Sequence, residues 1–211
     1  MRIVKQFLRR CRYGKAIIVV SGLPRSGTSM LMNMLASGGL ALVTDQVRES
    51  DLDNPKGYFE DERIKNLEND LDKSWLRNSR GRTIKVISHL LKELPHENYY
   101  KVILLRRNLE EIVASQNKML DRRGEPNPVS DEKAIEAYRN HLIDTKVFLR
   151  RAPNFELLEL QYMKIIRDSL ESARKVNEFL GGFLDVDAMA SVVDPTLYRN
   201  RKEQPERLIL S

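Results

Sequence analysis

The sequence has little cysteine and no long apolar segment. Cys11 is the only cysteine among 211 residues, which excludes an internal disulfide and a cysteine-rich metal site. The first apolar run, residues 16–20, has the length of a buried strand, so we expect no transmembrane span. The absence of disulfides agrees with a reducing compartment and predicts a cytoplasmic protein.

The charge of the chain is mildly positive and not concentrated. Lysine and arginine number 36 against 30 acidic residues, giving a net charge of +6, while hydrophobic residues make up 41%. This composition is typical of a globular protein that favours anionic ligands, and without a basic block it argues against nucleic acid as a partner. We expect a single domain over residues 1–211, with its core at about 15–182, a basic N-terminal segment at 1–14 and a polar tail at 194–211. The N-terminal segment is interpreted as a fraying terminus in preference to an amphipathic, membrane-touching helix.

Apolar runs rich in β-branched residues alternate with segments of helical period. Strands are predicted at 16–20, 40–43, 83–88, 101–105 and 155–160. Helices are predicted at 28–36, 60–76, 108–120, 131–149 and 164–180. This alternation predicts an α/β fold of three layers, in which helices cover both faces of a mainly parallel sheet.

A glycine-rich loop follows the first predicted strand. The stretch VSGLPRSGTSML (20–31) has two glycines five residues apart, as in a nucleotide-triphosphate loop, but it lacks the lysine after the second glycine. Thr28 stands in that place, and the positive charge comes from Arg25, before Gly27. The backbone N–H groups of such a turn, together with Arg25, Ser26, Thr28 and Ser29, predict an anion site at the start of a helix.

A second basic motif follows the apolar strand at 101–105. A metal-dependent nucleotide enzyme often has an aspartate at the end of such a strand, whereas this sequence has Arg106 and Arg107. Ser115 lies eight residues beyond Arg107, on the next predicted helix. A guanidinium and a hydroxyl from these positions are suited to hold a second phosphate, and Arg106 is an alternative to Arg107.

Together the two motifs resemble the sulfotransferase family. PRSGTS (24–29) is similar to that family's loop for the 5′-phosphosulfate of 3′-phosphoadenosine 5′-phosphosulfate (PAPS), and Arg107 through Ser115 is similar to its element for the 3′-phosphate. DNPKGYFE (53–60), IKVISHLL (84–91) and VVDPTLYRNR (192–201) look like a bacterial branch of the family. The resemblance covers roughly residues 15 to 200. Leu109 replaces a common proline, and Arg199–Lys202 echoes a downstream R-K-G element only in part.

The resemblance implies a sulfuryl transfer from PAPS to a hydroxyl or amine, with PAP as product and no metal ion. Arg25 is expected to neutralise charge on the leaving phosphate. The acceptor, a small molecule or a sugar, is not identified by the sequence, nor is the oligomeric state. The alternatives are a nucleotide kinase or other triphosphate enzyme, and a protein that binds PAPS or PAP without catalysis.

Two residues are candidates for the base that takes the proton of the acceptor. His89 lies in SHL, similar to a T-H-L element of the family, and shares a strand face with Lys85 if the strand continues through residue 89. Glu60 ends the NPKGYFE segment, and a glutamate at a helix start is also interpretable, in preference, as a simple electrostatic cap. His96 and His141 are predicted to be surface residues. Sequence alone leaves the choice between His89 and Glu60 open.

Overall fold

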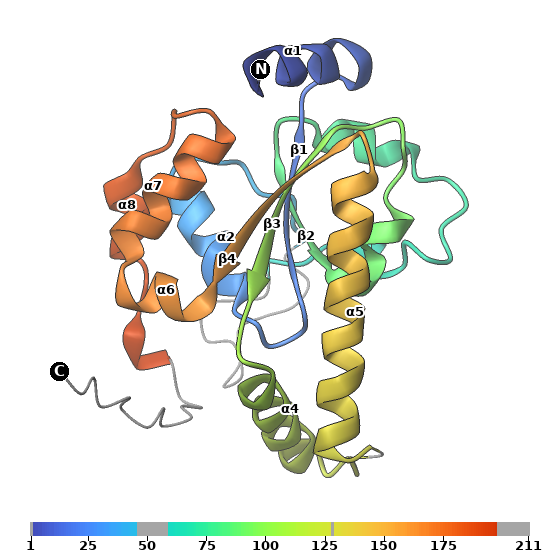
Figure 1. Cartoon of the computed structure of the whole chain (residues 1–211), viewed down its shortest axis with the longest axis vertical. Helices are drawn as coiled ribbons and strands as arrows, with labels where there is room; N and C mark the ends of the chain where they lie inside the picture. The colour runs from blue at the N-terminus through green and yellow to red at the C-terminus, as the bar shows by residue number, and fades with distance from the viewer. Residues whose placement is uncertain (1, 46–58, 128, 198–211) are drawn as a thin grey trace, which may run out of the picture.

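The computed structural model describes residues 2–45, 59–127 and 129–197. Its centre is a sheet of four parallel strands, β1 (Ile17–Gly22), β2 (Thr83–Ile87), β3 (Tyr100–Arg106) and β4 (Phe155–Gln161), in the order β2-β1-β3-β4. β1 and β3 are apolar and buried along most of their length, because helices cover both faces of the sheet. The predicted three-layer α/β fold is confirmed (Figure 1).

One face of the sheet is covered by four helices. These are α2 (Thr28–Ser37), α6 (Tyr162–Arg167), α7 (Ser169–Leu180) and α8 (Val186–Ser191). Side chains of these helices share a core with Ile18, Val20, Ile103 and Leu105 of the two central strands. Since adjacent strand residues point to opposite faces, Ile17, Val19 and Val102 belong to the core on the other side.

The second face carries α5 (Asp131–Arg151), the short α3 (Glu62–Lys65) and the 3-10 turns η1 (Ser74–Ser79) and η2 (Ser88–Glu93). A third 3-10 turn, η3, spans Pro195–Leu197. α4 (Leu109–Arg123) lies beyond the carboxyl end of β3, and α1 (Arg2–Tyr13) lies at the opposite end of the sheet (Figure 1). A small cluster of Leu23, Ile112 and Leu142 joins the loop after β1 to α4 and α5.

Two predicted elements in the first half of the chain differ in the structure. Residues 40–43 form only a bridge between Leu42 and Thr83, because the backbone N–H of Asp45 donates to Glu60 and leaves the sheet edge. The predicted helix at 60–76 is reduced to α3 and η1. Between these two elements, Asp70 and Asp72 accept hydrogen bonds from the backbone N–H groups of Asp72 and Ser74, which favours turns over helix.

The remaining differences concern the two ends of the chain. The predicted helix at 164–180 is two helices, α6 and α7, because the Asp168 side chain caps α7 by accepting from the backbone N–H of Glu171. α8 was not expected from the sequence. The basic N-terminal segment is not frayed but forms α1.

Candidate functional site

The glycine-rich loop lies at the carboxyl end of β1, between the ends of β2 and β3. Strand order reverses about β1, and ligands of open parallel sheets bind at such a point. Gly27 is the N-cap of α2, with a left-handed φ of 98°. A Cβ atom at Gly27 would lie 2.5 Å from the ring of Tyr162, and one at Gly22 would lie 2.4 Å from Ser26 Oγ. Both glycines are therefore required by the close packing of the loop.

The buried side chain of Ser26 is suited to an anion site. Ser26 is only 1% exposed, and its Oγ has no hydrogen-bond partner among the described residues. A buried hydroxyl in that state costs about 1–3 kcal/mol. Because it lies in the loop that precedes the N-terminus of α2, a phosphate oxygen is a suitable acceptor for it. The residues present thus fit the phosphosulfate group that the sequence resemblance implies.

Arg25 connects the loop to the second motif. Its Nε donates to Ser115 Oγ on α4 at 3.0 Å, and its carbonyl accepts from Arg107 Nη1 at 3.2 Å. Arg25 also has a positive φ of 67°, which is unfavourable for a residue with a Cβ atom. The structure therefore brings Arg25, Arg107 and Ser115 into one cluster at the ends of β1 and β3.

The two arginines at the end of β3 occupy different environments. The Arg107 side chain is buried, lies 3.0 Å from the Glu111 carboxylate and stacks over the ring of Tyr162 at 4.7 Å. The Arg106 side chain is exposed, with its Nη1 3.5 Å from Glu159 Oε2. Of this pair, Arg107 belongs to the loop cluster and Arg106 to a surface ion-pair group with Glu159.

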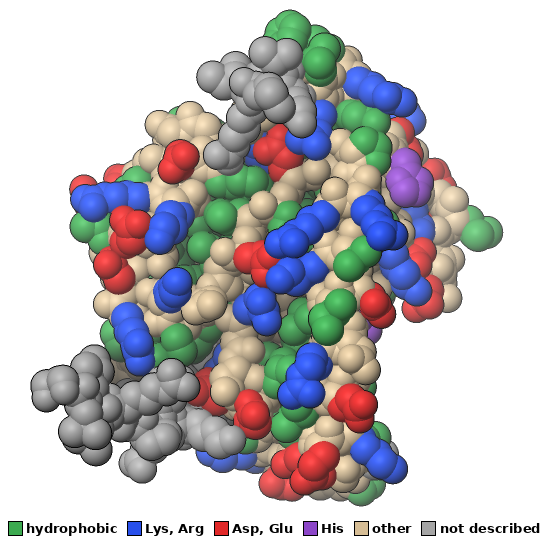
Figure 2. All heavy atoms as spheres, in the orientation of Figure 1, with side chains coloured by type: hydrophobic (Ala, Val, Ile, Leu, Met, Phe, Trp, Pro, Cys, Tyr) green, Lys and Arg blue, Asp and Glu red, His purple; other side chains and the backbone are tan. Residues whose placement is uncertain are grey.

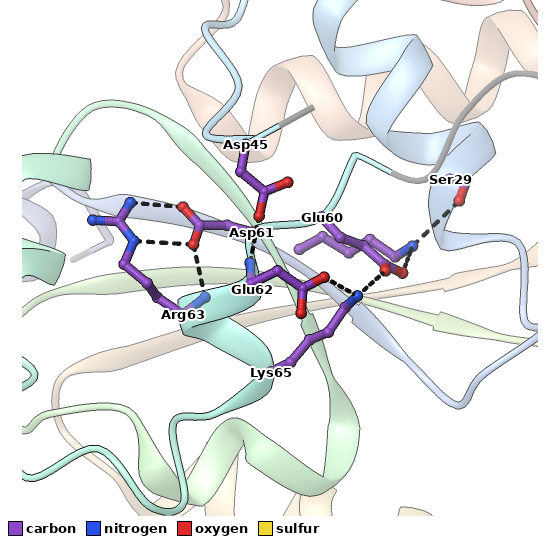
Figure 3. A network of polar contacts seen from close by, with 8 residues as sticks. Ser29, Asp45, Glu60, Asp61, Glu62, Arg63 and Lys65 are labelled. Atoms are coloured by element: carbon purple, nitrogen blue, oxygen red, sulfur yellow. Dashed lines mark hydrogen bonds and ion pairs between the residues drawn. The ribbon is translucent and has the colours of Figure 1, made fainter. Parts of the chain in front are cut away.

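A second polar cluster lies beside the first turn of α2. Lys85, on β2, donates from Nζ to Glu60 Oε1 at 3.0 Å and to Ser29 Oγ at 3.3 Å, and its side chain is only 9% exposed. Lys65 Nζ lies 2.9 Å from Glu60 Oε2 and 2.6 Å from Glu62 Oε1. Figure 3 shows Glu60 and Lys65 pointing toward one another, with Ser29 on the far side of Glu60. We call Ser29, Glu60, Lys65 and Lys85 the Glu60 cluster.

The ionisation of Glu60 is governed by these two lysines. Burial by itself raises the pKa of Glu60, but the charge of Lys85 and the hydrogen bonds from Lys65 and Lys85 outweigh it. The pKa therefore lies below its ordinary value, and Glu60 is ionised at neutral pH. Such a carboxylate can accept a proton or a hydrogen bond from a neighbouring hydroxyl.

The backbone next to Glu60 has two features that constrain its position. Phe59, the preceding residue, has a positive φ of 49°, and the Glu60 carbonyl accepts from the N–H of Asp45. Asp61, not Glu60, is the N-cap of α3, because its carboxylate accepts from the N–H of Arg63 at 3.0 Å. The hydrogen-bonding cap of α3 is therefore Asp61, and Glu60 lies one residue before it.

His89 lies in a third group of contacts. β2 ends at Ile87 and η2 begins at Ser88, so the strand does not extend through residue 89 as the shared face with Lys85 would require. The His89 ring stacks on that of His141 from α5, with centroids 3.7 Å apart, and His141 Nε2 lies 2.8 Å from Ser88 Oγ. Burial, together with the Lys92 charge, lowers the pKa of His89.

The structure also places two other residues discussed from the sequence, Thr28 and His141. Thr28 is the first residue of α2. His141 is half-buried rather than a surface residue, because its ring packs under His89.

Four residues of the site, Lys85, Lys65, Glu111 and Tyr162, were not identified from the sequence. Lys85 carried a signal, since it is a single charged residue within the apolar strand TIKVI. In the described residues, no cluster of three or more His, Cys, Asp or Glu side chains is arranged to hold a metal ion.

Comparison with known proteins identifies the family. The family described as sulfotransferase domain matches residues 15–207. A comparison with the curated proteins finds no match. Among solved structures, the chain is similar to mouse sulfotransferase SULT7A1 complexed with PAP, with a TM-score of 0.50, 16% identity and coverage of 84% of this chain. It spans only 62% of that mouse protein.

Two further structures resemble the chain over nearly their whole length. The sulfotransferase domain from the curacin biosynthetic pathway has a TM-score of 0.54 and 14% identity over 90% of this chain and 93% of that domain. A sulfotransferase from Alicyclobacillus acidocaldarius has a TM-score of 0.51 and 15% identity over 87% of this chain and 88% of its own. At these identities, the likeness to the solved structures shows the fold alone. The family match over residues 15–207 covers both the glycine-rich loop and the second basic motif. The chain therefore belongs to the sulfotransferase domain family.

Proposed function

We propose that the protein transfers a sulfuryl group from PAPS to a hydroxyl or amine of an acceptor. The observation that carries this proposal is the cluster in which Arg25 contacts Ser115 and Arg107, because it unites the loop and the second motif at one end of the sheet. Family membership and the buried Ser26 hydroxyl support the same donor. The mouse neighbour was solved in complex with PAP, the expected product.

The proposed roles follow from the chemistry of each group. The loop N–H groups with Ser26, Gly27, Thr28 and Ser29 hold the 5′-phosphosulfate at the N-terminus of α2. Arg107 and Ser115 hold the 3′-phosphate, with the exposed Arg106 available from the surface. Arg25 lies between the two groups, where its charge stabilises the leaving phosphate.

When bound, PAPS supplies the sulfuryl group, whose sulfur forms a bond to the acceptor as its bond to the 5′-phosphate breaks. The proton of the acceptor passes to a protein base. We propose Glu60 as this base, because Lys85 connects its carboxylate to Ser29 in the first turn of α2. The contacts of His89 lead instead to His141 and α5, which supports it less as a base. The Lys85 ammonium lies where it can also offset negative charge next to the loop.

The surroundings of the reaction are defined more coarsely. No described helix has the length and apolar character needed to cross a membrane. A cytoplasmic location and a bacterial origin are retained as proposals from the sequence. The acceptor remains a hydroxyl or amine compound of undefined identity.

A ligand-induced thermal shift tests the donor. We expect PAP, at a hundredfold excess over its Kd, to raise the Tm by about 5–10 °C, because a ligand at that excess stabilises the folded state by about 2.7 kcal/mol. ATP with magnesium should give a much smaller shift. Arg25→Ala should abolish the PAP shift, whereas Arg139→Ala, an exposed arginine on α5, should retain it. Stabilisation by ATP with magnesium alone would overturn the proposed donor and favour a triphosphate enzyme.

A further inference from the structure

The N-terminal helix α1 is docked on the protein by its polar side. Arg9 Nε donates to the carbonyl of Pro153 at 2.8 Å, and Arg9 Nη1 lies 2.8 Å from Glu156 Oε1. Gln6 also donates to Glu156, at 3.3 Å. Gln6, Arg9 and Tyr13 are the partly buried residues of the described side chains of this helix. Their spacing of three and four residues defines one helix face.

The opposite face of α1 is apolar and exposed. Phe7 is 64% exposed, Leu8 is 60% exposed, and Cys11 lies one turn further along the same side. In the sequence, Ile3 and Val4 precede Phe7 and Leu8 by one helical turn. Most helices of globular proteins bury their apolar face and expose the polar one, so α1 has the reverse arrangement.

The exposed surface around this apolar face is basic. α1 contains five lysines and arginines and no acidic residue, and among them Arg10 and Arg12 are exposed. Lys15, two residues after the end of α1, is exposed, and so is Arg82, whose carbonyl accepts from Ile18 near the amino end of β1. Figure 2 shows apolar and basic side chains next to one another at the end of the molecule occupied by α1.

From this arrangement we propose that α1 binds the surface of an anionic phospholipid bilayer. Phe7 and Leu8 are suited to enter the acyl boundary, while the neighbouring arginines contact lipid phosphates. A helix of 12 residues cannot span a bilayer, so the contact is interfacial. Nucleic acid would use the charges but not the apolar side chains. A second copy of the chain would use the apolar side chains but would bring like charges together.

Vesicle flotation tests the proposal with the full chain. We expect binding to vesicles of phosphatidylcholine mixed with phosphatidylglycerol, weaker binding in high salt, and little binding to phosphatidylcholine alone. Phe7→Ser combined with Leu8→Ser should weaken binding by about tenfold or more, because two apolar side chains no longer leave water. Arg10→Glu combined with Arg12→Glu should weaken it by about a hundredfold or more, since each charge contributes about 1 kcal/mol.

Matched variants on α5 control for surface changes in general. Ile143→Ser with Val147→Ser removes two exposed apolar residues, and Lys133→Glu with Arg139→Glu reverses two exposed charges. Both should bind vesicles like the wild type. Circular dichroism of each variant checks that the fold is retained.

Three outcomes would overturn the proposal. The first is equal binding to neutral and anionic vesicles, and the second is unchanged binding of the Phe7→Ser, Leu8→Ser variant. The third is a chain that does not bind anionic vesicles. Two further measurements then identify the partner: sedimentation, for a dimer that the same variant dissociates, and binding to duplex DNA. The dimer would identify a second copy as the partner of α1, and the DNA a nucleic acid.

Discussion

At the scale of single residues, Lys85 and Glu60 form the pair on which the proposed chemistry depends most. Their charges meet at 3.0 Å in a half-buried setting next to α2, and the lysine lowers the pKa of the carboxyl against the effect of burial. A carboxylate that remains ionised is a ready proton acceptor, although a low pKa also makes it a weaker base. The pair thus sets the pH range in which the proposed base is active.

Replacement of Lys85 should move the acidic limb of the pH–rate profile. Glu60 accepts a proton only when ionised, so activity falls as the pH drops through its lowered pKa, below its ordinary value of 4.5. In Lys85→Met the effect of burial is less opposed, and the limb of kcat/KM should move to higher pH. Glu60→Gln should lower kcat by about a hundredfold to ten-thousandfold, as loss of a general base does.

His89→Ala is the matched comparison for this test. The proposal for Glu60 fails if His89→Ala loses activity while Glu60→Gln keeps it, or if Lys85→Met leaves the acidic limb in place. Loss of thermal stability in Lys85→Met without a change in the profile would assign the lysine a structural role only.

The residues of the candidate anion site could be proposed from the sequence because their spacing is local. Arg25, Ser26 and Thr28 lie within six residues of the end of β1, and Gly22 and Gly27 mark the turn. The Glu60 cluster was only partly predictable. It unites residues from four separate segments of the chain, and no local pattern shows that Lys85 and Ser29 lie beside Glu60.

At the scale of elements, α4 positions the second motif by its N-terminus. Asn108 caps the helix by accepting from the backbone N–H of Glu111 at 3.0 Å. Glu111 then pairs with Arg107, and Ser115 lies one turn further on, where it accepts from Arg25. The cap therefore fixes the start of the helix from which Glu111 and Ser115 project.

Loss of this cap should weaken the fold measurably. Asn108→Ala should lower the free energy of unfolding by about 1 kcal/mol, because the N–H of Glu111 loses its acceptor. Ser130→Ala is the control, since Ser130 is the N-cap of α5 but makes no side-chain cap hydrogen bond. Urea unfolding monitored by circular dichroism gives both values. Equal losses in the two variants would contradict the assigned role of Asn108.

Two of the elements that the sequence mispredicted have one physical cause in common. In residues 60–76 and 164–180 the helical period is present, but Asp70, Asp72 and Asp168 hydrogen-bond to nearby backbone N–H groups. These bonds stop or restart a helix at positions that the apolar period does not mark. The ends of the four strands were predicted to within two residues. Apolar runs mark these strands, and in the two inner strands, β1 and β3, the runs are buried on both faces of the sheet.

At the scale of the whole molecule, Glu156 of β4 joins the N-terminal helix to the sheet. Its carboxylate accepts from Gln6, Arg9 and the hydroxyl of Tyr99. Burial alone raises the pKa of Glu156, but the hydrogen bonds, with Tyr99 first and Gln6 next, and the charge of Lys101 outweigh it and lower the pKa. This single side chain is therefore the main polar contact for α1.

The contribution of Glu156 to stability should depend on pH. Because its folded pKa is lowered, the stabilisation is complete above the ordinary value of 4.5 and is lost as the pH falls through the folded pKa. Glu156→Gln should lower the free energy of unfolding by about 1–3 kcal/mol at neutral pH, and the difference from wild type should shrink in acid. Urea unfolding across pH measures it, with Glu136→Gln, an exposed acid on α5, as the control. A difference that stays constant into acid would rule out an ionised Glu156 as its source.

The parallel sheet separates α1 from the phosphate-binding loop, because α1 precedes the amino end of β1 and the loop follows its carboxyl end (Figure 1). A strand of six residues is about 20 Å long. If α1 lies on a bilayer, the loop stands at least that far above the lipid headgroups and faces the aqueous side. An acceptor embedded in that same leaflet would be out of reach. On this proposal, the orientation of one helix would favour acceptors that arrive from water, whatever their chemical class.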